Sequence, residues 1–244
     1  MPQDFGPTSL ANLNQIPQSG SNTAAEFRMQ TDYLKAPINI PVVLSSAAIK
    51  GATTLAITAH AVTGKVIPAG VLLHFPGGVG KADITVLTTA PVVAADAVVN
   101  IEALGSDIAS AAATAWEGYY YPALQAEVTL TTNGTTTKID LHSASGRKAW
   151  STALKSGMEY TISFKSEAPS DDPVIRMMTD VAESTGDNAV MNFRYRDGRG
   201  GWRYGNITTS TAGRTTPVRA QEEQTFTGMG LGKYFRRYAA DNAS

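Results

Sequence analysis

The sequence contains no cysteine and little charge, and each shortage excludes a class of protein. Without cysteine, a chain of 244 residues has no disulfide framework, no thiolate nucleophile and no cysteine-ligated zinc site. Asp, Glu, Lys and Arg together make up only 17% of the residues, against about a quarter in a typical soluble domain. A surface this poor in charge suits a protein whose exterior is largely covered by copies of itself.

The chain also lacks a charge excess of either sign. Its net charge of -1 and pI near 6.3 differ from the basic excess of general nucleic-acid and membrane-surface binders. No apolar run approaches the length that spans a bilayer. The first residues, MPQDFGPTSLANLNQ, have neither the basic nor the apolar region of a signal peptide. We therefore expect no membrane partner and no secretion signal.

Residues that could carry catalysis or hold a metal are scarce. The three histidines, His60, His74 and His142, do not have the spacing of a metal site, and no G-x-S-x-G nucleophile motif occurs. Asp140 and His142 leave one enzymatic alternative, although Asp140 in a TTTKID strand is better explained as a surface residue or a cross-strand partner. We expect no catalytic residue, no cofactor and no metal.

The stretch FPGGVGKA, residues 75–82, ends in Gly-Lys as phosphate-binding loops do but lacks their other parts. Phe75 stands where such a loop has its first glycine, and Ala82 stands where a Ser or Thr would bind the metal ion. The residues that follow alternate like a strand, whereas a phosphate site needs a helix N-terminus. We interpret the stretch as a connection between strands whose glycines permit positive φ.

An internal repeat surrounds that connection. Three matches relate its halves: Val43–Ser46 with Val86–Thr89, Leu55-x-Ile57 with Val99-x-Ile101, and Ile67 and Phe75 with Ile108 and Trp116. Each half predicts a strand, a turn, a strand, a loop and a strand. Two copies are too few for a solenoid but suffice for a small β-barrel or sandwich with pseudo-symmetry.

Elsewhere the sequence predicts amphipathic strands and a single helix. Alternating residues predict strands at 26–34, 158–165 and 221–230, and Asn133-Gly134 is the strongest short hairpin signal. Ser170, Asp171 and Asp172 are candidate helix caps. Pro173 follows in the first turn, an apolar stripe runs from Val174 to Ala182, and Gly186 closes the helix. The expected fold is mainly β, a sandwich or open barrel with one packed α-helix.

Two segments combine arginines with aromatic residues. RYRDGRGGWRY interleaves Arg194, Arg196, Arg199 and Arg203 with Tyr195, Trp202 and Tyr204, as single-strand nucleic-acid platforms do. The alternative is a two-faced hairpin whose aromatics are buried and whose arginines face outward or pair across an interface, which the balanced charge favours. We interpret KYFRRYAADNAS, with Tyr234, Phe235 and Tyr238, as a docking tail.

The order of elements from about Tyr121 onward carries a family resemblance. Its motifs are Gly146-Arg147-Lys148-Ala149-Trp150, the acidic helix start Asp171-Asp172-Pro173, a glycine-rich turn between two strands, and Thr227-Gly228-Met229-Gly230 in the last strand. In this order they resemble the major tail tube protein of long-tailed bacteriophages. The resemblance covers roughly the C-terminal half and the strand at 26–34.

The resemblance implies a division of the chain. A tail-tube-type β-sandwich or open barrel would consist of residues 26–36 and 119–232, with an N-terminal arm at 1–25 and a C-terminal tail at 233–244. Residues 37–118 would be an inserted small β domain with the internal repeat, carried on the tube exterior. Its peripheral place predicts that assembly survives deletion of residues 38–117.

The same resemblance implies a virion structural protein of the tail, assembled in the host cytoplasm. Hexameric rings would stack into a tube through which DNA passes without specific binding, with the tail terminator, baseplate or tip and tape measure proteins as partners. Edge strands would join subunits, while the N-terminal arm and the hairpin around Asn133-Gly134 would bridge rings. Contacts between subunits are expected at Asn133, Gly134, Thr135, Arg147, Trp150, Arg199, Trp202 and Phe235.

One alternative comes from a different class of protein. The repeat region could be a host- or carbohydrate-binding β module of a phage tail or surface protein. Tyr119, Tyr120 and Tyr121 would then offer stacking surfaces for sugar rings. Rings or tubes of the purified protein would support the tail tube, and a glycan-binding monomer would support the alternative.

Overall fold

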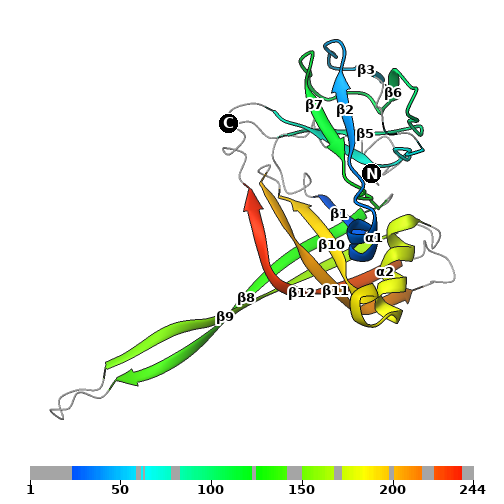
Figure 1. Ribbon diagram of the computed structural model, residues 1–244. Helices are drawn as coiled ribbons and strands as arrows, with labels where there is room; N and C mark the ends of the chain where they lie inside the picture. The colour runs from blue at the N-terminus through cyan, green and yellow to red at the C-terminus, as the bar shows by residue number, and fades with distance from the viewer. Residues whose placement is uncertain are drawn as a thin grey trace, which may run out of the picture.

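The chain is mainly β, as the sequence predicts, and its strands form a large sheet with a smaller strand-rich unit at one end (Figure 1). The computed structural model describes residues 24–58, 62, 64–77, 83–122, 125–141, 150–167, 172–197, 201–215 and 223–237. We call the large sheet the main sheet, and we call the unit formed by residues 40–116 the module.

The main sheet has six antiparallel strands in the order β1-β10-β11-β12-β9-β8. Their bounds are β1 Ala24–Met29, β8 Gln125–Leu141, β9 Trp150–Ser166, β10 Met191–Arg196, β11 Trp202–Thr215 and β12 Glu223–Arg237. The edge strands β1 and β8 approach one another, so the sheet curls toward an open barrel.

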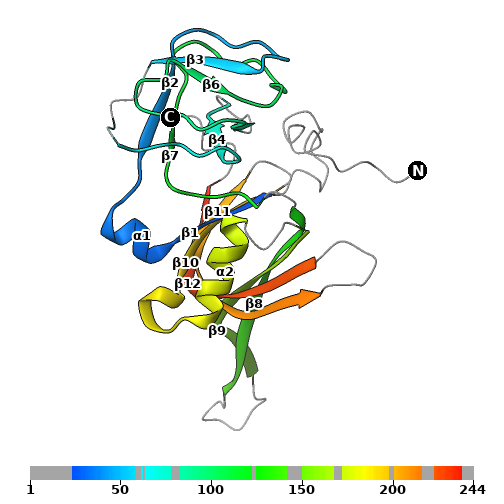
Figure 2. The ribbon, with the colours of Figure 1, turned by 90° about the vertical axis from the view of Figure 1, so that its right-hand side faces the viewer.

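Helix α2, Pro173–Glu183, packs across one face of the main sheet (Figure 2). The Asp172 side chain caps it by accepting hydrogen bonds from the backbone N–H groups of Val174 and Ile175, at 2.9 and 3.2 Å. Val174, Met178 and Val181 are buried as the stripe predicts, and Ile175 joins them. The helix ends three residues before Gly186, which instead begins the 3₁₀ helix η3, Gly186–Ala189.

A second helix corrects the expectation of a strand over residues 26–34 and of a single helix. Strand β1 begins at Ala24 and ends at Met29, which pairs with Met191, the first residue of β10. Beyond Met29 the partner strand has ended, so the backbone satisfies its hydrogen bonds locally as helix α1, Gln30–Lys35. The earlier part of the predicted arm lies outside the described residues.

The predicted turn at Asn133-Gly134 is wrong. Both residues lie in the middle of β8, opposite Glu159 and Met158 of β9. The two strands pair over 17 residues each, interrupted by a register shift after Thr135. This long non-local ladder overrides the local turn preference of Asn-Gly. The connection between β8 and β9, residues 142–149, lies outside the described residues.

The predicted boundary of the C-terminal tail at residue 233 is also wrong. Strand β12 continues to Arg237, which pairs with Trp202. Tyr234 is buried in the core under α2, with its ring 5.2 Å from that of Tyr160. An aromatic residue that fills the core keeps this segment in the sheet.

The module contains six short strands around its own apolar core. They are β2 Ile40–Leu44, β3 Thr54–Thr58, β4 Leu72–Phe75, β5 Ile84–Leu87, β6 Val98–Asn100 and β7 Ala113–Trp116. Four of them form a sheet in the order β6-β3-β2-β7, and β4 pairs with β5.

The strands of the module fall where the repeat places them. The first strand of each half pairs with the last strand of the other half, as β2 with β7 and β5 with β4. The bridge between Ala48 and Ile108 has its counterpart in the bridge between Val92 and Ile67. FPGGVGKA thus connects β4 to β5, although residues 78–82 lie outside the described part.

Candidate assembly surfaces

The β8–β9 hairpin extends beyond the body of the main sheet (Figure 1). Strand β9 pairs with β12 only over Thr161–Ser166. Its residues 150–160 pair, among the described residues, with β8 alone. We call this two-stranded outer part, residues 133–141 and 150–159, the ribbon. A two-stranded hairpin by itself is marginally stable in water.

The register of the ribbon brings its apolar positions together. Leu141 lies opposite Trp150, Ile139 opposite Thr152, and Leu154 opposite Thr137. Positions directly opposite share a face of an antiparallel pair, and alternate positions along each strand do as well. One face of the ribbon therefore collects the apolar positions, while Lys138 and Asp140 belong to the other.

The body of the main sheet exposes three large apolar side chains on β12. Met229 is 53% exposed, Leu231 41% and Phe235 70%. Their partners on β11 are Thr208, Asn206 and Tyr204, which alternate along that strand and so share one face. We call Met229, Leu231 and Phe235 the apolar strip.

Glycines whose missing Cβ atoms would point to the opposite face of β12 let core side chains pack directly against the backbone of this strand. A Cβ atom on Gly230 would lie 2.4 Å from the Tyr160 ring, and one on Gly228 would lie 2.7 Å from Ile207. Core side chains therefore press directly on the β12 backbone, and the Tyr160 hydroxyl donates to the carbonyl oxygen of Asn206. In the sequence, the alternation Gly-Met-Gly-Leu indicates one face of glycines and one apolar face, but Met229 and Leu231 were not among the expected contacts.

The two edges of the main sheet differ in what covers them. Strand β1 exchanges hydrogen bonds with the segment before β8, through Phe27 and Tyr120 at 2.9 and 2.8 Å. Strand β8 has β9 on one side and, in the part of the chain that the structure describes, no strand on the other. An edge of this length is a template for pairing with another chain.

The expected contact residues fall into three groups. Asn133, Gly134 and Thr135 are exposed and lie at the base of the ribbon, Trp150 begins β9 within it, and Phe235 belongs to the apolar strip. Arg147 and Arg199 lie outside the described residues. Trp202 is buried inside the chain, 3% exposed, so its contacts in this conformation are internal.

A buried ionic cluster joins the main sheet to the module. Glu26 of β1 is fully buried and receives two hydrogen bonds of 2.7 Å from Arg194 of β10. His74 of β4 places its Nε2 atom 2.8 Å from the same carboxylate and its Nδ1 atom 3.0 Å from the Thr85 hydroxyl. The cluster brings together residues that no short-range spacing in the sequence connects.

The electrostatics of the cluster fix its protonation. Burial by itself would raise the pKa of Glu26, but the charge of Arg194, then the charge of His74 and the hydrogen bonds from both residues, hold this pKa at about 2. Burial lowers the pKa of His74 below its ordinary value, although Glu26 opposes the shift. His74 is thus neutral at pH 7, donating from Nε2 to Glu26 and accepting at Nδ1 from Thr85.

A second set of contacts distinguishes between the two arrangements expected for the arginines of this hairpin, which were to face outward or to pair across an interface. Arg194 and Arg196 are 7% and 5% exposed. Arg196 donates to the Thr85 hydroxyl at 2.6 Å and to the Asp83 carbonyl oxygen at 3.1 Å. The Asp83 carboxylate accepts from the Trp202 indole at 3.0 Å and from Arg237. Arg194 and Arg196 thus pair across an interface within the chain and are not available to an exposed nucleic-acid platform.

The three consecutive tyrosines provide no shared stacking surface. Tyr119 and Tyr121 are 4% and 6% exposed, and Tyr120 is half-buried. The Tyr119 ring lies 4.4 Å from the Arg194 guanidinium, and burial raises the Tyr119 pKa to about 12 against the effect of Arg28 and Arg194. The surface on which the carbohydrate-binding alternative depended is therefore buried where the ionic cluster joins the module to the main sheet, a region that we call the junction.

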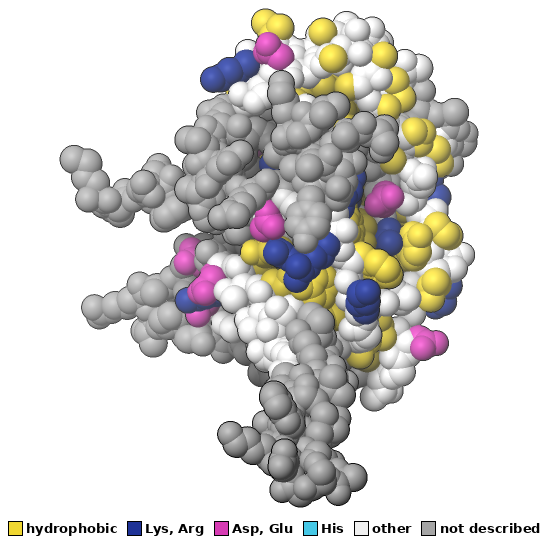
Figure 3. Space-filling view, turned by 90° about the vertical axis from the view of Figure 1, so that its left-hand side faces the viewer, with side chains coloured by type: hydrophobic (Ala, Val, Ile, Leu, Met, Phe, Trp, Pro, Cys, Tyr) yellow, Lys and Arg dark blue, Asp and Glu magenta, His cyan; other side chains and the backbone are white. Residues whose placement is uncertain are grey.

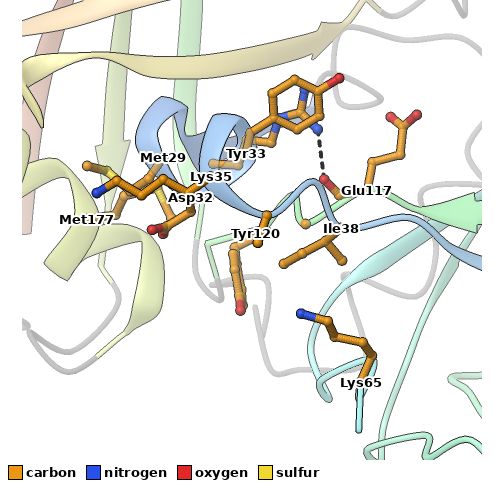
Figure 4. A pocket seen from close by; sticks show the side chains of 12 residues that line it. Met29, Asp32, Tyr33, Lys35, Ile38, Lys65, Glu117, Tyr120 and Met177 are labelled. Carbon is orange, nitrogen blue, oxygen red and sulfur yellow. Dashed lines mark hydrogen bonds between the residues drawn. The ribbon is translucent and has the colours of Figure 1, made fainter. Parts of the chain in front are cut away.

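A pocket of about 230 Å³ lies where α1 and α2 approach the module (Figure 4). Cations and anions line it together, including Lys35, Lys65 and Asp32, and Arg28 donates to the Glu117 carbonyl oxygen at 2.8 Å. The described residues contain no cluster of His, Asp or Glu that could hold a metal ion. None of their helices is long and apolar enough to cross a membrane.

Comparisons with known proteins give only a distant likeness. No protein family and no curated protein matches the chain. One similar solved structure is the tail of an empty gene transfer agent (GTA) particle with C6 symmetry: 14% identity and a TM-score of 0.41 over 48% of this chain and 85% of that one. Another is the virion of a native GTA particle, with 14% identity and a TM-score of 0.40 over 49% of this chain and 88% of that one. At these values the likeness carries no argument about function.

Proposed function

We propose that the chain is a non-enzymatic structural protein of a phage tail, and that its copies assemble into stacked hexameric rings forming a tube for DNA. The observation that carries the proposal is the ribbon. It extends from a well-packed sheet, its apolar positions share one face, and its two strands pair, among the described residues, only with each other. Such a segment is stable where other copies complete it. The sequence resemblance to tail tube proteins supports the same function.

Two further surfaces suit repeated association. The free edge of β8 can pair with a strand of another copy, and the apolar strip offers an exposed apolar contact on the same sheet. Figure 3 shows the side of the molecule where β12 lies, with hydrophobic side chains beside a group of Lys and Arg side chains. We assign these surfaces to contacts within and between rings.

The remaining roles follow from this proposal. Residues 24–36 and 119–237 form the part that builds the tube, and the module lies on its exterior, because a folded unit of this size would obstruct a channel for DNA. DNA passes without specific binding. The tail terminator, the baseplate or tip and the tape measure protein are the partners of the assembled tube.

Assembly of the purified protein tests the proposal. Negative-stain imaging and mass photometry should show rings or tubes. A shortened variant, in which Asn-Gly replaces residues 137–154 and leaves Thr136 paired with Lys155, should keep the melting temperature of the body and form no tubes. The control is Lys138→Ser, on the polar face of the ribbon, which should assemble normally. A wild-type chain that stays monomeric at all concentrations would refute the function.

A further inference from the structure

We propose that the junction is a pH switch, in which protonation of His74 separates the module from the main sheet while both parts stay folded. The two parts meet through side chains, because no described strand of the module pairs with a strand of the main sheet. Each part also has an apolar core of its own. The inference concerns how the module is held on the body, and it applies whether or not copies of the chain form tubes.

A chain of hydrogen bonds with a fixed direction crosses the junction. Arg196 of β10 donates to the Thr85 hydroxyl of β5 at 2.6 Å, and this hydroxyl donates its own proton to Nδ1 of His74, 3.0 Å away. Nε2 of His74 in turn donates to the Glu26 carboxylate of β1 at 2.8 Å. A proton added at Nδ1 makes this atom a donor that faces the Thr85 hydroxyl, so the hydroxyl loses the acceptor of its proton.

The charges around His74 oppose the same protonation. They are Glu26 on β1, Arg194 and Arg196 on β10, and, bonded to the neighbouring Trp202, Asp83 with its partner Arg237. Glu26 already balances Arg194 through two hydrogen bonds of 2.7 Å. A protonated His74 therefore adds a positive charge to a buried site that already holds two arginines.

This environment makes separation favourable in acid. Burial, with the charges of Arg194 and Arg196, lowers the pKa of His74 in the closed junction against the effect of Glu26. Once the module has separated, His74 faces water and has its ordinary pKa of 6.5, so below this pH the open state takes up a proton that the closed state does not. Below pH 4.5 Glu26 acts in the same direction, because its pKa is about 2 in the closed junction.

The connections between the two parts allow the movement. Gly118, where the chain leaves the module, has φ 81°, and a Cβ atom built on it would lie 3.4 Å from Ile38, where the chain enters. The two connections therefore lie side by side. Beyond them, Tyr120 is fixed to β1 by backbone hydrogen bonds with Phe27. Rotation about the adjacent connections moves the module and leaves the main sheet intact, as in a hinge.

Adjacent alanines of β1 can report opening of the junction and opening of the main sheet separately. Ala24 is 1% exposed and packs at the junction with Leu72 of β4, whereas Ala25 is buried in the core under α2. Because the chain has no native cysteine, Ala24→Cys and Ala25→Cys each carry a single thiol. Labelling with dithiodipyridine, normalised to the thiol of Ile49→Cys at an exposed position, measures how often each site opens.

Between pH 6.5 and pH 4.5, normalised labelling of Ala24→Cys should rise about tenfold per pH unit, because opening takes up one proton. Ala25→Cys should stay protected, and so should Leu73→Cys, which lies in the core of the module. Leu72→Cys repeats the measurement from the module side of the junction, in case Ala24→Cys does not fold.

His74→Gln, added to the Ala24→Cys chain, identifies the group that takes up the proton. Its amide keeps one donor and one acceptor but does not titrate in this range, so the rise in labelling should disappear. A rise that persists in His74→Gln would overturn the switch, as would the absence of any rise in Ala24→Cys and Leu72→Cys. Equal acceleration of Ala24→Cys and Ala25→Cys would also overturn it, because the main sheet would then be unfolding.

Discussion

The junction between the module and the main sheet contrasts with the ribbon in the kind of side chain that it contains and in where the partners of those side chains lie. At the junction, charged residues are buried, and each has its partner within the chain, as Glu26 has Arg194 and His74. In the ribbon, apolar positions share one face of two strands that pair, among the described residues, only with each other. The contrast teaches that buried polar residues join the two parts of this molecule, while apolar residues such as Met229 and Phe235 remain exposed at its surface.

The strongest way to break the junction is Glu26→Gln. The substitution leaves the buried Arg194 guanidinium with only the half-exposed Glu117 carboxylate, 3.8 Å away, as a counter-ion, and removing one partner of a buried pair costs about 3–5 kcal/mol. The free energy of unfolding, measured by urea denaturation, should fall by that amount. Glu223→Gln is the control, because the Glu223–Lys165 pair is 2.7 Å apart but about a third exposed, and such pairs contribute about 1 kcal/mol or less. Equal losses in the two variants would contradict the junction's role.

Adjacent positions of β12 separate stability from assembly. Gly230→Ala places a Cβ against the Tyr160 ring and should cost about 1–3 kcal/mol of unfolding free energy, as overpacking does. Met229→Ala, one residue earlier on the exposed face, should leave unfolding unchanged and weaken assembly. Thermal melting and mass photometry of both variants check the pair. A stable Gly230→Ala protein would show that the core does not press on β12.

How much of the fold could be predicted from the sequence depends on how close together along the chain the residues that determine each element lie. The α2 helix follows from Asp172, Pro173 and the apolar stripe, which act within a few residues of one another. The module strands follow from a repeat visible in the sequence. The turn at Asn133-Gly134 failed because its local preference competes with pairing to β9, which the sequence does not display.

The junction was beyond sequence reasoning for the same reason. Glu26 is separated from His74 by 48 positions and from Arg194 by 168, so no spacing rule connects them. The arginines were expected to face outward or to pair across an interface, and no local pattern distinguishes these arrangements. The junction also bears on the expectation that assembly survives deletion of residues 38–117. This deletion removes His74, Thr85 and Asp83, which are hydrogen-bond partners of the buried Glu26, Arg196 and Trp202.

Acidification should loosen the junction before it affects the rest of the chain. The pKa of His74 is lowered in the folded state, so below its ordinary value of 6.5 the unfolded state binds more protons and gains stability. The free energy of unfolding should fall by up to about 1.4 kcal/mol per pH unit over that window. The Glu26 contribution, with a folded pKa of about 2 against 4.5, is full above pH 4.5 and lost toward pH 2.

Denaturation at pH 7, 6 and 5 measures this slope. His74→Gln keeps an amide that can donate to Glu26 but cannot titrate, so its stability should change less over the same range. Glu26→Gln should steepen the loss further, because His74 then lacks the carboxylate that opposes the fall of its pKa. Identical slopes for wild type and His74→Gln would assign the acid sensitivity to other groups.

The smallest expected effect lies within the module, where its two halves differ at one equivalent backbone position. Gly70 has φ 76° and donates its N–H to the Thr88 carbonyl oxygen at 2.8 Å, while Ala111 has φ 59° and donates to the Leu44 carbonyl oxygen at 3.0 Å. The left-handed conformation favours glycine, so Ala111→Gly should stabilise by up to about 1 kcal/mol. Gly70→Ala should destabilise by a similar amount, through the backbone alone, because no atom lies within 4 Å of the added Cβ. Opposite shifts of the melting temperature would show that both halves use the same turn, and unchanged melting of both variants would deny it.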